Sequence, residues 1–417
     1  MEILSTGQKI KRARIYKGIT LKELCKDKIS ISKMSCIENG KIEADEETIK
    51  YIADVMEVDY EYLAKDVYDQ IKGYTKEIEE SKEHIDNYEK KANDIISYAM
   101  DYEYYDLALE LMHNLFSYHI ENEKYDENEK LISKYYSIYE KSINDKSTIT
   151  YFMDIGIYLF NKEEYAEAYI YFSKILDLNV VNIDKNIKTY LMIKYRQAEC
   201  LYKSSKYDLA EKCLEEIILI EKMEFKNIDG AKVYNLFSLV LIRQCKIDGE
   251  KFKEKAIELT KDTKDLLARM HLEYGKAYYY VGNNTEAINE IKESIKLYPK
   301  DNDVEYAKFI NEAIEILIEK GEIDIALENI EDSLNIAIST NNIKLIERAY
   351  YLKACTLQKQ DKFQQSEMYM NLSIDALFKF GSKKERYKRY IDMANLYYKI
   401  GNINDTIKYF NIALAID

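Results

Sequence analysis

The chain has 417 residues, which is too long for one ordinary domain, and a formal net charge of −14. Its composition, 47% hydrophobic and 33% charged, excludes a disordered chain. It contains 12 Gly and one Pro; because sheet-rich folds need these residues in their turns, the shortage predicts a nearly all-α protein. No segment approaches the ~18 apolar residues of a membrane-spanning helix, and the N-terminus has no apolar signal core. The six cysteines form no CxxC pair, so we expect reduced thiols and a cytoplasmic protein without membrane contacts.

Charge is unevenly distributed along the chain. Residues 1–41 contain ten basic and four acidic residues, a net charge of +6, whereas the remaining 51 basic and 71 acidic residues give −20. A basic head on an acidic body indicates that only the head meets a polyanion such as nucleic acid. Chance clustering of lysines on a solvated helix face would produce the same pattern.

The head is expected to form four short helices. The first covers 7–17, and Thr20 with Glu23 forms a capping box at the start of the second. The third covers 31–39 and the fourth about 46–56, each between capping or turn residues. The expected core consists of Ile10, Ile19, Leu24, Met34, Ile37, Ile49, Ile52, Ala53, Val58 and Leu63.

The segment RIYKGITLKEL…ISISKMSCIENGK…ADVMEVDYEYL resembles the phage-repressor class of helix-turn-helix domain. The resemblance implies that Arg14 of the first helix pairs with Glu38 of the third as a structural contact. It also implies that the third helix enters the major groove of DNA. The DNA-binding residues implied by it are Ile31, Ser32, Lys33, Ser35 and Cys36 at the bases, with Asn39 and Lys41 near phosphates. The sequence departs from the family at Leu21, where Gln is usual, and in a shorter turn before the third helix.

Residues 67–91 are expected to form a linker helix. Apolar residues recur there and just beyond at nearly heptad spacing, with Ser81 the one gap. The positions are Ile71, Tyr74, Ile78, Ile85, Tyr88, Ala92 and Ile95. Two interpretations remain open: a helix that pairs two chains, or a helix packed against the first repeat behind it.

The rest of the chain, 92–417, is expected to be an array of helical repeats. Small residues followed by bulky ones recur with a period of about 40 residues, each typical of the second helix of a tetratricopeptide repeat (TPR). These small positions are Ala108, Ala168, Ala210, Ala287, Ala326, Ser366 and Thr406, and the first-helix positions twelve residues before the last six are Gly156, Ala198, Gly275, Ile314, Ala354 and Ala394. A degenerate repeat with Ser238 fills the gap around 231–262. Stacked TPR units form a right-handed solenoid whose concave groove is lined by first helices.

The first helices carry a row of basic and amide side chains that the repeat register places on the groove face. Amides can hydrogen-bond an extended peptide backbone, and cations can hold its carboxylates. The expected peptide-binding residues are Lys232, Asn235, Arg269, Lys276, Lys308, Asn311, Arg348, Tyr351, Lys388 and Asn395. Alternatively, these cations pair with neighbouring acids such as Glu273 or Glu315.

A repressor-type head on such an array resembles the RRNPP family of peptide-pheromone receptors. The resemblance implies a helix-turn-helix domain over 1–66, a linker helix over 67–91 and a peptide-binding TPR domain over 92–417. It implies a quorum-sensing transcription regulator that acts as a homodimer on a palindromic operator in double-stranded DNA, under control of a short signalling peptide.

No catalytic residue, metal site or cofactor is expected. The sequence has no HExxH motif and no Gly-rich phosphate loop, and its four His lack ligand spacing. Two other functions remain open: a Rap-like regulator that acts on a response regulator by binding or phosphatase activity, and a TPR scaffold with an inert head.

Overall fold

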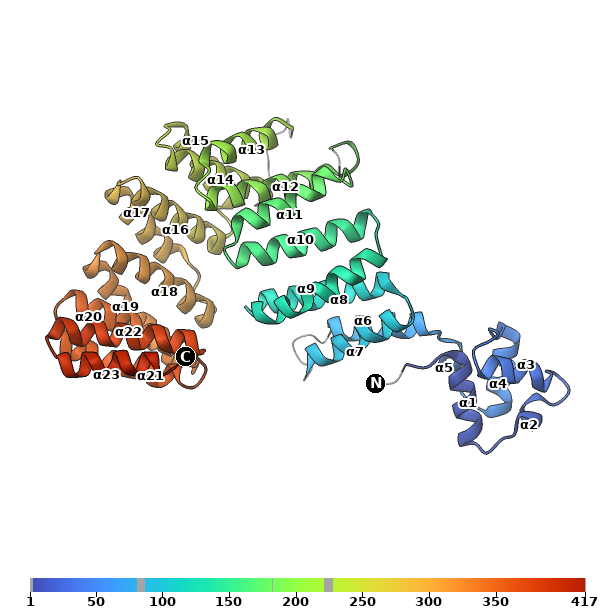
Figure 1. Ribbon diagram of the computed structural model, residues 1–417. Coiled ribbons are helices and arrows are strands. Elements are labelled where there is room, and N and C mark those ends of the chain that lie inside the picture. Colours follow the sequence, from blue (N-terminus) through green and yellow to red (C-terminus); the bar gives the residue numbers. More distant parts are fainter. Residues whose placement is uncertain (1–2, 81–86, 182, 221–227, 417) are drawn as a thin grey trace. The chain divides into compact units, whose positions relative to one another are not determined.

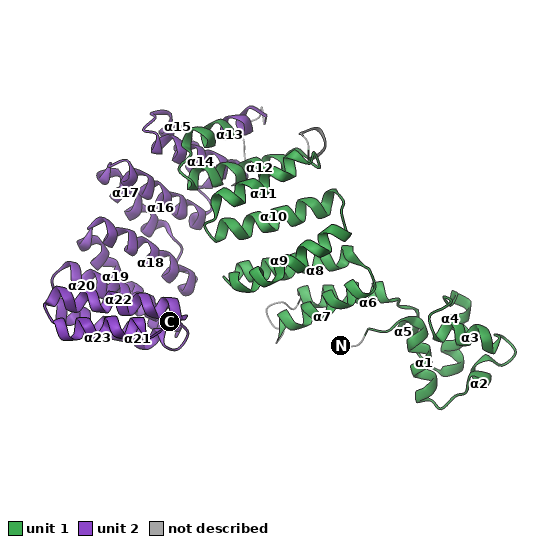
Figure 2. Ribbon diagram, viewed as in Figure 1, with its two compact units in different colours: residues 1–213 green, residues 214–417 purple. Residues whose placement is uncertain are grey.

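The computed structural model describes residues 3–80, 87–181, 183–220 and 228–416, and over these ranges the chain forms 23 helices and no strand (Figure 1). The expected all-α fold is confirmed. The chain divides into two compact units, residues 1–213 and 214–417 (Figure 2). All six cysteines are free thiols. In the described part of the chain, no helix is both long enough and apolar enough to cross a bilayer.

The head consists of α1 (Thr6–Tyr16), α2 (Leu21–Cys25), α3 (Ile31–Glu38), α4 (Glu46–Met56) and α5 (Tyr60–Ala64). The predicted capping box forms at α2, and a second, at Ser5 and Gln8, opens α1. Side chains from α1 to α5 meet in one core. The predicted core residues are buried in it, except that Ile19 and Val58 are only partly buried at its edge.

The expected linker helix is replaced by two helices, α6 (Val67–Glu80) and α7 (Tyr88–Asp101), which pack on each other and on α8 (Tyr105–Glu121). Ser81 and Ile85 lie outside the described residues. The near-heptad positions buried in this core are Ile71, Ile78, Tyr88, Ala92 and Ile95, each at most 4% exposed. Packing inside the chain therefore accounts for their spacing, and residues buried in this way cannot form a seam with a second chain.

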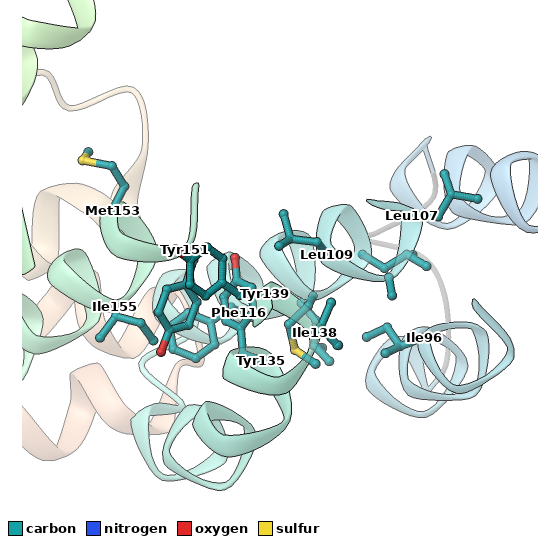
Figure 3. Packing of buried hydrophobic residues seen from close by; sticks show 14 of the residues in the cluster. Ile96, Leu107, Leu109, Phe116, Tyr135, Ile138, Tyr139, Tyr151, Met153 and Ile155 are labelled. Carbon is teal, nitrogen blue, oxygen red and sulfur yellow. The ribbon is translucent and has the colours of Figure 1, made fainter. Parts of the chain in front are cut away.

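The core of unit 1 includes an aromatic cluster between α8 and the two helices that follow it in the chain (Figure 3). Phe116, Tyr135 and Tyr151 lie with their ring centroids 5.1–5.5 Å apart in successive pairs. Tyrosine thus fills the core positions between helices here, which gives the many tyrosines of this chain a packing role.

Downstream of α9 (Tyr125–Lys141), first and second helices alternate as the sequence predicts. The first helices are α10 (Asp145–Asn161), α12 (Ile183–Lys203), α14 (Ile228–Arg243), α16 (Lys264–Tyr280), α18 (Asp303–Lys320), α20 (Ile343–Lys359) and α22 (Lys383–Ile400). The second helices are α11 (Tyr165–Asp177), α13 (Tyr207–Ile220), α15 (Asp248–Thr260), α17 (Asn284–Leu297), α19 (Ile323–Ser339), α21 (Phe363–Leu377) and α23 (Ile403–Leu414). Every small or packing position predicted for these helices is buried.

Small residues are required because the paired helices approach closely. A Cβ on Gly275 of α16 would lie 2.6 Å from Cγ1 of Ile291 on α17, and one on Gly156 would lie 2.5 Å from Cε1 of Phe172. Both distances are shorter than any van der Waals contact, so the glycines set how tightly each pair packs.

Two parts of the array differ from the simple repeat pattern. The degenerate repeat is formed by α14 and α15, where Gly249 takes the small position and its carbonyl accepts from Ser238 Oγ at 2.8 Å. The sequence pattern missed α9, because Asn128 stands where an alanine is usual. Asn128 is fully buried and donates to the carbonyl of Phe116 at 3.0 Å. Consequently α8, expected to be a second helix, packs on both α7 and α9.

Candidate DNA-binding and peptide-binding surfaces

The outer side of α3 carries the residues that the repressor resemblance assigns to DNA. Ile31, Ser32, Lys33, Asn39 and Lys41 are exposed, while Ser35 and Cys36 are half-buried. Met34 and Ile37, on the opposite side of the same helix, are buried in the head core. The expected DNA-binding residues therefore lie together and are accessible from one side.

A buried ion pair holds α3 in place. Arg14 donates to the Glu38 carboxylate through Nε at 2.6 Å and Nη2 at 3.0 Å, and its Nη1 donates to the carbonyl of Ile19 at 3.0 Å. The Glu38 side chain is only 4% exposed. The hydrogen bond to Glu38 raises the pKa of Arg14 above its usual value. The predicted pairing is confirmed, and it ties α3 to α1 through a bidentate contact.

Weaker polar contacts position the surface residues of α3. Lys33 Nζ lies 3.4 Å from Asp45 Oδ2, and both side chains are largely exposed. Asn39 donates to the carbonyl of Ser35 at 2.8 Å and accepts from Lys11 Nζ at 3.3 Å. Exposed ion pairs contribute little stability, so Lys33 can exchange Asp45 for a phosphate or a base edge at small cost.

The expected peptide-binding residues in unit 2 form links between successive first helices. Lys276 of α16 contacts Glu312 of α18 at 2.7 Å, and Tyr351 of α20 donates to Asp392 of α22 at 3.0 Å. Arg348 of α20 pairs with Glu315 of α18 in the same way. Lys276 also contacts Glu273 at 2.6 Å. In the structure these cations therefore pair with neighbouring acids, which was the alternative to peptide binding.

Arg269 and Lys308 share one acidic partner, Glu305 of α18. Lys308 Nζ lies 2.7 Å from Glu305 Oε1, and Arg269 Nη2 lies 4.0 Å from Glu305 Oε2. Arg269 also donates to the hydroxyl of Tyr298 at 2.9 Å, and its guanidinium lies over the Tyr298 ring. Arg269 is 46% and Lys308 57% exposed, so an incoming carboxylate could displace Glu305.

The remaining expected peptide-binding residues are not equivalent. Lys232, Lys388 and Asn395 are exposed, and Asn235 is half-buried. Asn311 differs from the expectation, because it is only 4% exposed and its Oδ1 accepts from Ser333 Oγ at 2.6 Å. It joins the two helices of one repeat and is not available on the surface.

Sequence reasoning missed a buried charge cluster directly beside Tyr351. Arg389 of α22 lies 2.7 Å from Glu347 of α20, each is at most 10% exposed, and Glu347 also accepts from Ser373 at 2.6 Å. The Arg389 guanidinium is 3.3 Å from the centroid of the Tyr351 ring. The signal that could have revealed it is a charged residue at an otherwise apolar first-helix position, as both Glu347 and Arg389 are.

Over the described ranges, no group of three or more His, Cys, Asp or Glu side chains is arranged to hold a metal ion. The chain is thus an all-helical, TPR-like protein with two candidate binding surfaces, one on α3 of the head and one on the first helices of unit 2.

Comparison with known proteins gives structural neighbours alone, since no protein-family model and no curated protein matches the sequence. The apo quorum sensor NprR from B. thuringiensis shares 16% identity at a TM-score of 0.44, over 84% of this chain and 99% of that one. Bacillus thuringiensis PlcR, in complex with the peptide PapR7 and DNA, shares 15% identity at a TM-score of 0.33, over 66% of this chain and 98% of that one. Aspartyl phosphate phosphatase F from Bacillus subtilis shares 16% identity at a TM-score of 0.41, over 100% of this chain and 95% of that one.

The structural neighbours include RRNPP-family quorum sensors, the family that the sequence resembles. Identities of 15–16% and TM-scores below 0.5 transfer no function to this chain. The functional argument below therefore rests on this chain's own residues.

Proposed function

We propose that this chain is a peptide-responsive transcription regulator. Its head binds double-stranded DNA, two copies read a palindromic operator, and a short signalling peptide held by the repeat array controls DNA binding. The observation that carries the proposal is the accessible face of α3, held by the buried Arg14–Glu38 pair within residues 1–41, a segment of net charge +6.

The chemistry of this face suits the major groove. Lys33 and Ser32 can donate hydrogen bonds to base edges, and Ile31 can contact a thymine methyl group. Lys41 and Asn39, at the end of α3, suit phosphate contacts, which add affinity that falls with salt. Residues 42–417 carry a net charge of −20 and repel the duplex, so binding is restricted to the surface that residues 1–41 form.

The test is DNA binding by the full chain to the region upstream of its own gene, measured by gel shift over a salt series. A Lys33→Ala, Ser35→Ala double variant should lose about 10- to 100-fold in specific affinity, as expected for lost base contacts, while its helicity is unchanged. The matched control is Lys50→Ala, because Lys50 is an exposed lysine on α4, with a side chain 58% exposed against 44% for Lys33. Operator affinity equal to that of the control would refute the assignment of α3. A Rap-like regulator or a TPR scaffold would show no specific binding at all.

Peptide control follows from linkage. A peptide shifts the DNA-binding conformer only by the difference between its affinities for the two conformers. Two links between first helices in unit 2, Arg269–Glu305 and Arg348–Glu315, are partly exposed ion pairs, each worth about 0–1 kcal/mol. A peptide carboxylate that displaces Glu305 or Glu315 would therefore change contacts between repeats at low cost.

The second test is a charge-reversed variant, Arg269→Glu with Lys308→Glu. It should bind DNA normally without peptide and lose the response to any synthetic peptide that changes DNA binding by the wild type. Lys296→Glu is the control, because Lys296 is 74% exposed on the second helix α17. A full peptide response in the double variant would refute the role of these two residues.

A further inference from the structure

Residues 3–5, which precede α1 and which we call the strap, connect the head to the core of the helices behind it. The Ile3 side chain is 4% exposed and belongs to the same core as Val67 and Ile71 of α6. That core is separate from the head core, which side chains of α1 to α5 form. Ser5, at the other end of the strap, caps α1. The strap therefore joins the first helix of the head to α6, within unit 1.

The side-chain amide of Gln70, on α6, binds both polar groups of the Leu4 backbone. Gln70 Nε2 donates to the Leu4 carbonyl at 2.8 Å, and the Leu4 N–H donates to Gln70 Oε1 at 3.4 Å. Gln70 Nε2 also donates to the carbonyls of Asp66 at 2.8 Å and Lys65 at 3.3 Å. Leu4 is itself partly exposed, so water can replace Gln70 at its backbone. The strap can thus detach without leaving a buried polar group unpaired, which keeps the cost of release low.

A buried lysine stabilises the second connection between the head and α6. Lys9 of α1 is 2% exposed, and its Nζ donates to the carbonyls of Tyr62 at 2.7 Å and Lys65 at 2.6 Å. These carbonyls lie at the end of α5 and in the two-residue joint, 65–66, that leads into α6. A single short joint leaves a domain free to turn about it. Because the strap is a second attachment, it removes that freedom and fixes the orientation of the head on α6.

The space beside the strap is not filled by side chains. A cavity of about 350 Å³ lies between the strap, α1 and α6, and Leu4, Lys9, Gln70 and Gly73 are among the residues that line it. A Cβ on Gly73 would have no neighbouring atom within 4 Å. Protein interiors are normally close-packed, so few contacts oppose the movement of the strap on this side.

We propose that the strap is a releasable fastening that holds the head in one orientation on α6, and that control of DNA binding passes through it, a second step that rests on the proposed function. While the strap is docked, the orientation of α3 is fixed relative to α6, which suits a head that has to meet one half-site of an operator. After release, the head turns about the joint 65–66, and a change in the repeats no longer reaches α3. A peptide that binds one of these two states more tightly shifts operator affinity by that difference.

The experiment measures the rotation of the head in the full chain. The sequence contains no Trp, so a single Tyr16→Trp substitution gives a fluorescent probe in the head, at a side chain of α1 that is 91% exposed. With the strap intact, the fluorescence anisotropy of this Trp should decay with the rotation of the whole molecule. In a strap variant, Ile3→Ser with Gln70→Ala, a faster component should appear, because the head then rotates separately. Side-chain motion of the probe is common to both proteins and does not produce this difference.

The matched control is Gln365→Ala, the same substitution at an exposed glutamine of α21, which should leave the decay unchanged. Gln70→Ala alone removes only hydrogen bonds, so it should give a smaller fast component with unchanged helicity. This variant keeps the test decisive if Ile3→Ser disturbs the core. Identical decays in the control and in both Gln70 variants would overturn the proposal.

Gel shift on the same proteins tests the second step. The strap variant should still bind the operator, because α3 is untouched, and should lose the response to any synthetic peptide that changes DNA binding by the wild type. A full peptide response in a protein whose head rotates separately would overturn control through the strap. A wild type that binds no operator, or that responds to no peptide, would contradict the proposed function, and the anisotropy decay would still decide whether the strap holds the head.

Discussion

The Arg14–Glu38 pair provides the sharpest test of how the head is built. In an Arg14→Met variant, the Glu38 carboxylate stays 4% exposed and loses two charge-assisted hydrogen bonds. Breaking a buried pair from one side costs about 3–5 kcal/mol. A domain of this size has a total stability of about 3–9 kcal/mol, so the variant head should lose between a third and all of its stability while the repeat array keeps its own.

Hydrogen exchange measured by mass spectrometry on the full chain resolves the two parts. In the Arg14→Met variant, amides of α1 and α3 should lose protection, and those of α16 to α23 should not change. A double variant, Arg14→Met with Glu38→Met, should recover most of the protection, because no unpaired charge remains buried. Lys50→Ala, which breaks an exposed pair with Glu46, should leave the protection of the head unchanged, because exposed ion pairs contribute little stability. Full protection of α3 in the single variant would refute the reasoning.

Two further predictions concern the repeat array. Gly275→Ala should destabilise unit 2 by about 1–3 kcal/mol, since the added Cβ overlaps Ile291. Gly73→Ala is the control: its Cβ would have nothing within 4 Å, so it should stabilise α6 by about 0.5–1 kcal/mol. Equal effects of the two substitutions in chemical denaturation would contradict the packing argument. The hydrogen bond to Asp154, 2.7 Å away, raises the pKa of His113. Its stabilising contribution is therefore present at acidic pH and is lost as pH rises through the raised pKa, so His113→Gln should lower the melting temperature more at pH 5.5 than at pH 8.5. A loss that does not vary with pH would show that the charged form of His113 is not what Asp154 stabilises.

Local sequence signals were sufficient wherever the structure depends on local contacts. Thr20 and Glu23 close a capping box within one turn, so the start of α2 could be predicted from four residues. The repeat positions could be predicted for a related reason: close helix approach excludes large residues, as Gly275 shows, and leaves a periodic pattern. The repeat pattern missed α9 because Asn128 stands at the position where the pattern requires a small residue. Its buried amide is accommodated there by hydrogen bonds to His119 and Phe116, which a pattern of residue sizes cannot reveal.

Contacts between residues far apart in the sequence decided which side chains are exposed and which are buried or paired. The apolar spacing over α6 and α7 was compatible with a chain-pairing seam or an internal core, and only packing on α8 distinguished them. The row of cations on the first helices was predicted, with peptide binding and pairing with acids such as Glu273 or Glu315 both left open. Only the structure decided between them, because a rotamer and a neighbouring helix determine each partner.

The sequence alone determined the helical fold, the repeat register and the position of the basic head, because these follow from propensity, period and charge along the chain. Only the tertiary structure decided which of those residues are exposed. It buries Asn311 and pairs Arg348 with Glu315, since exposure depends on whether another helix lies against a surface.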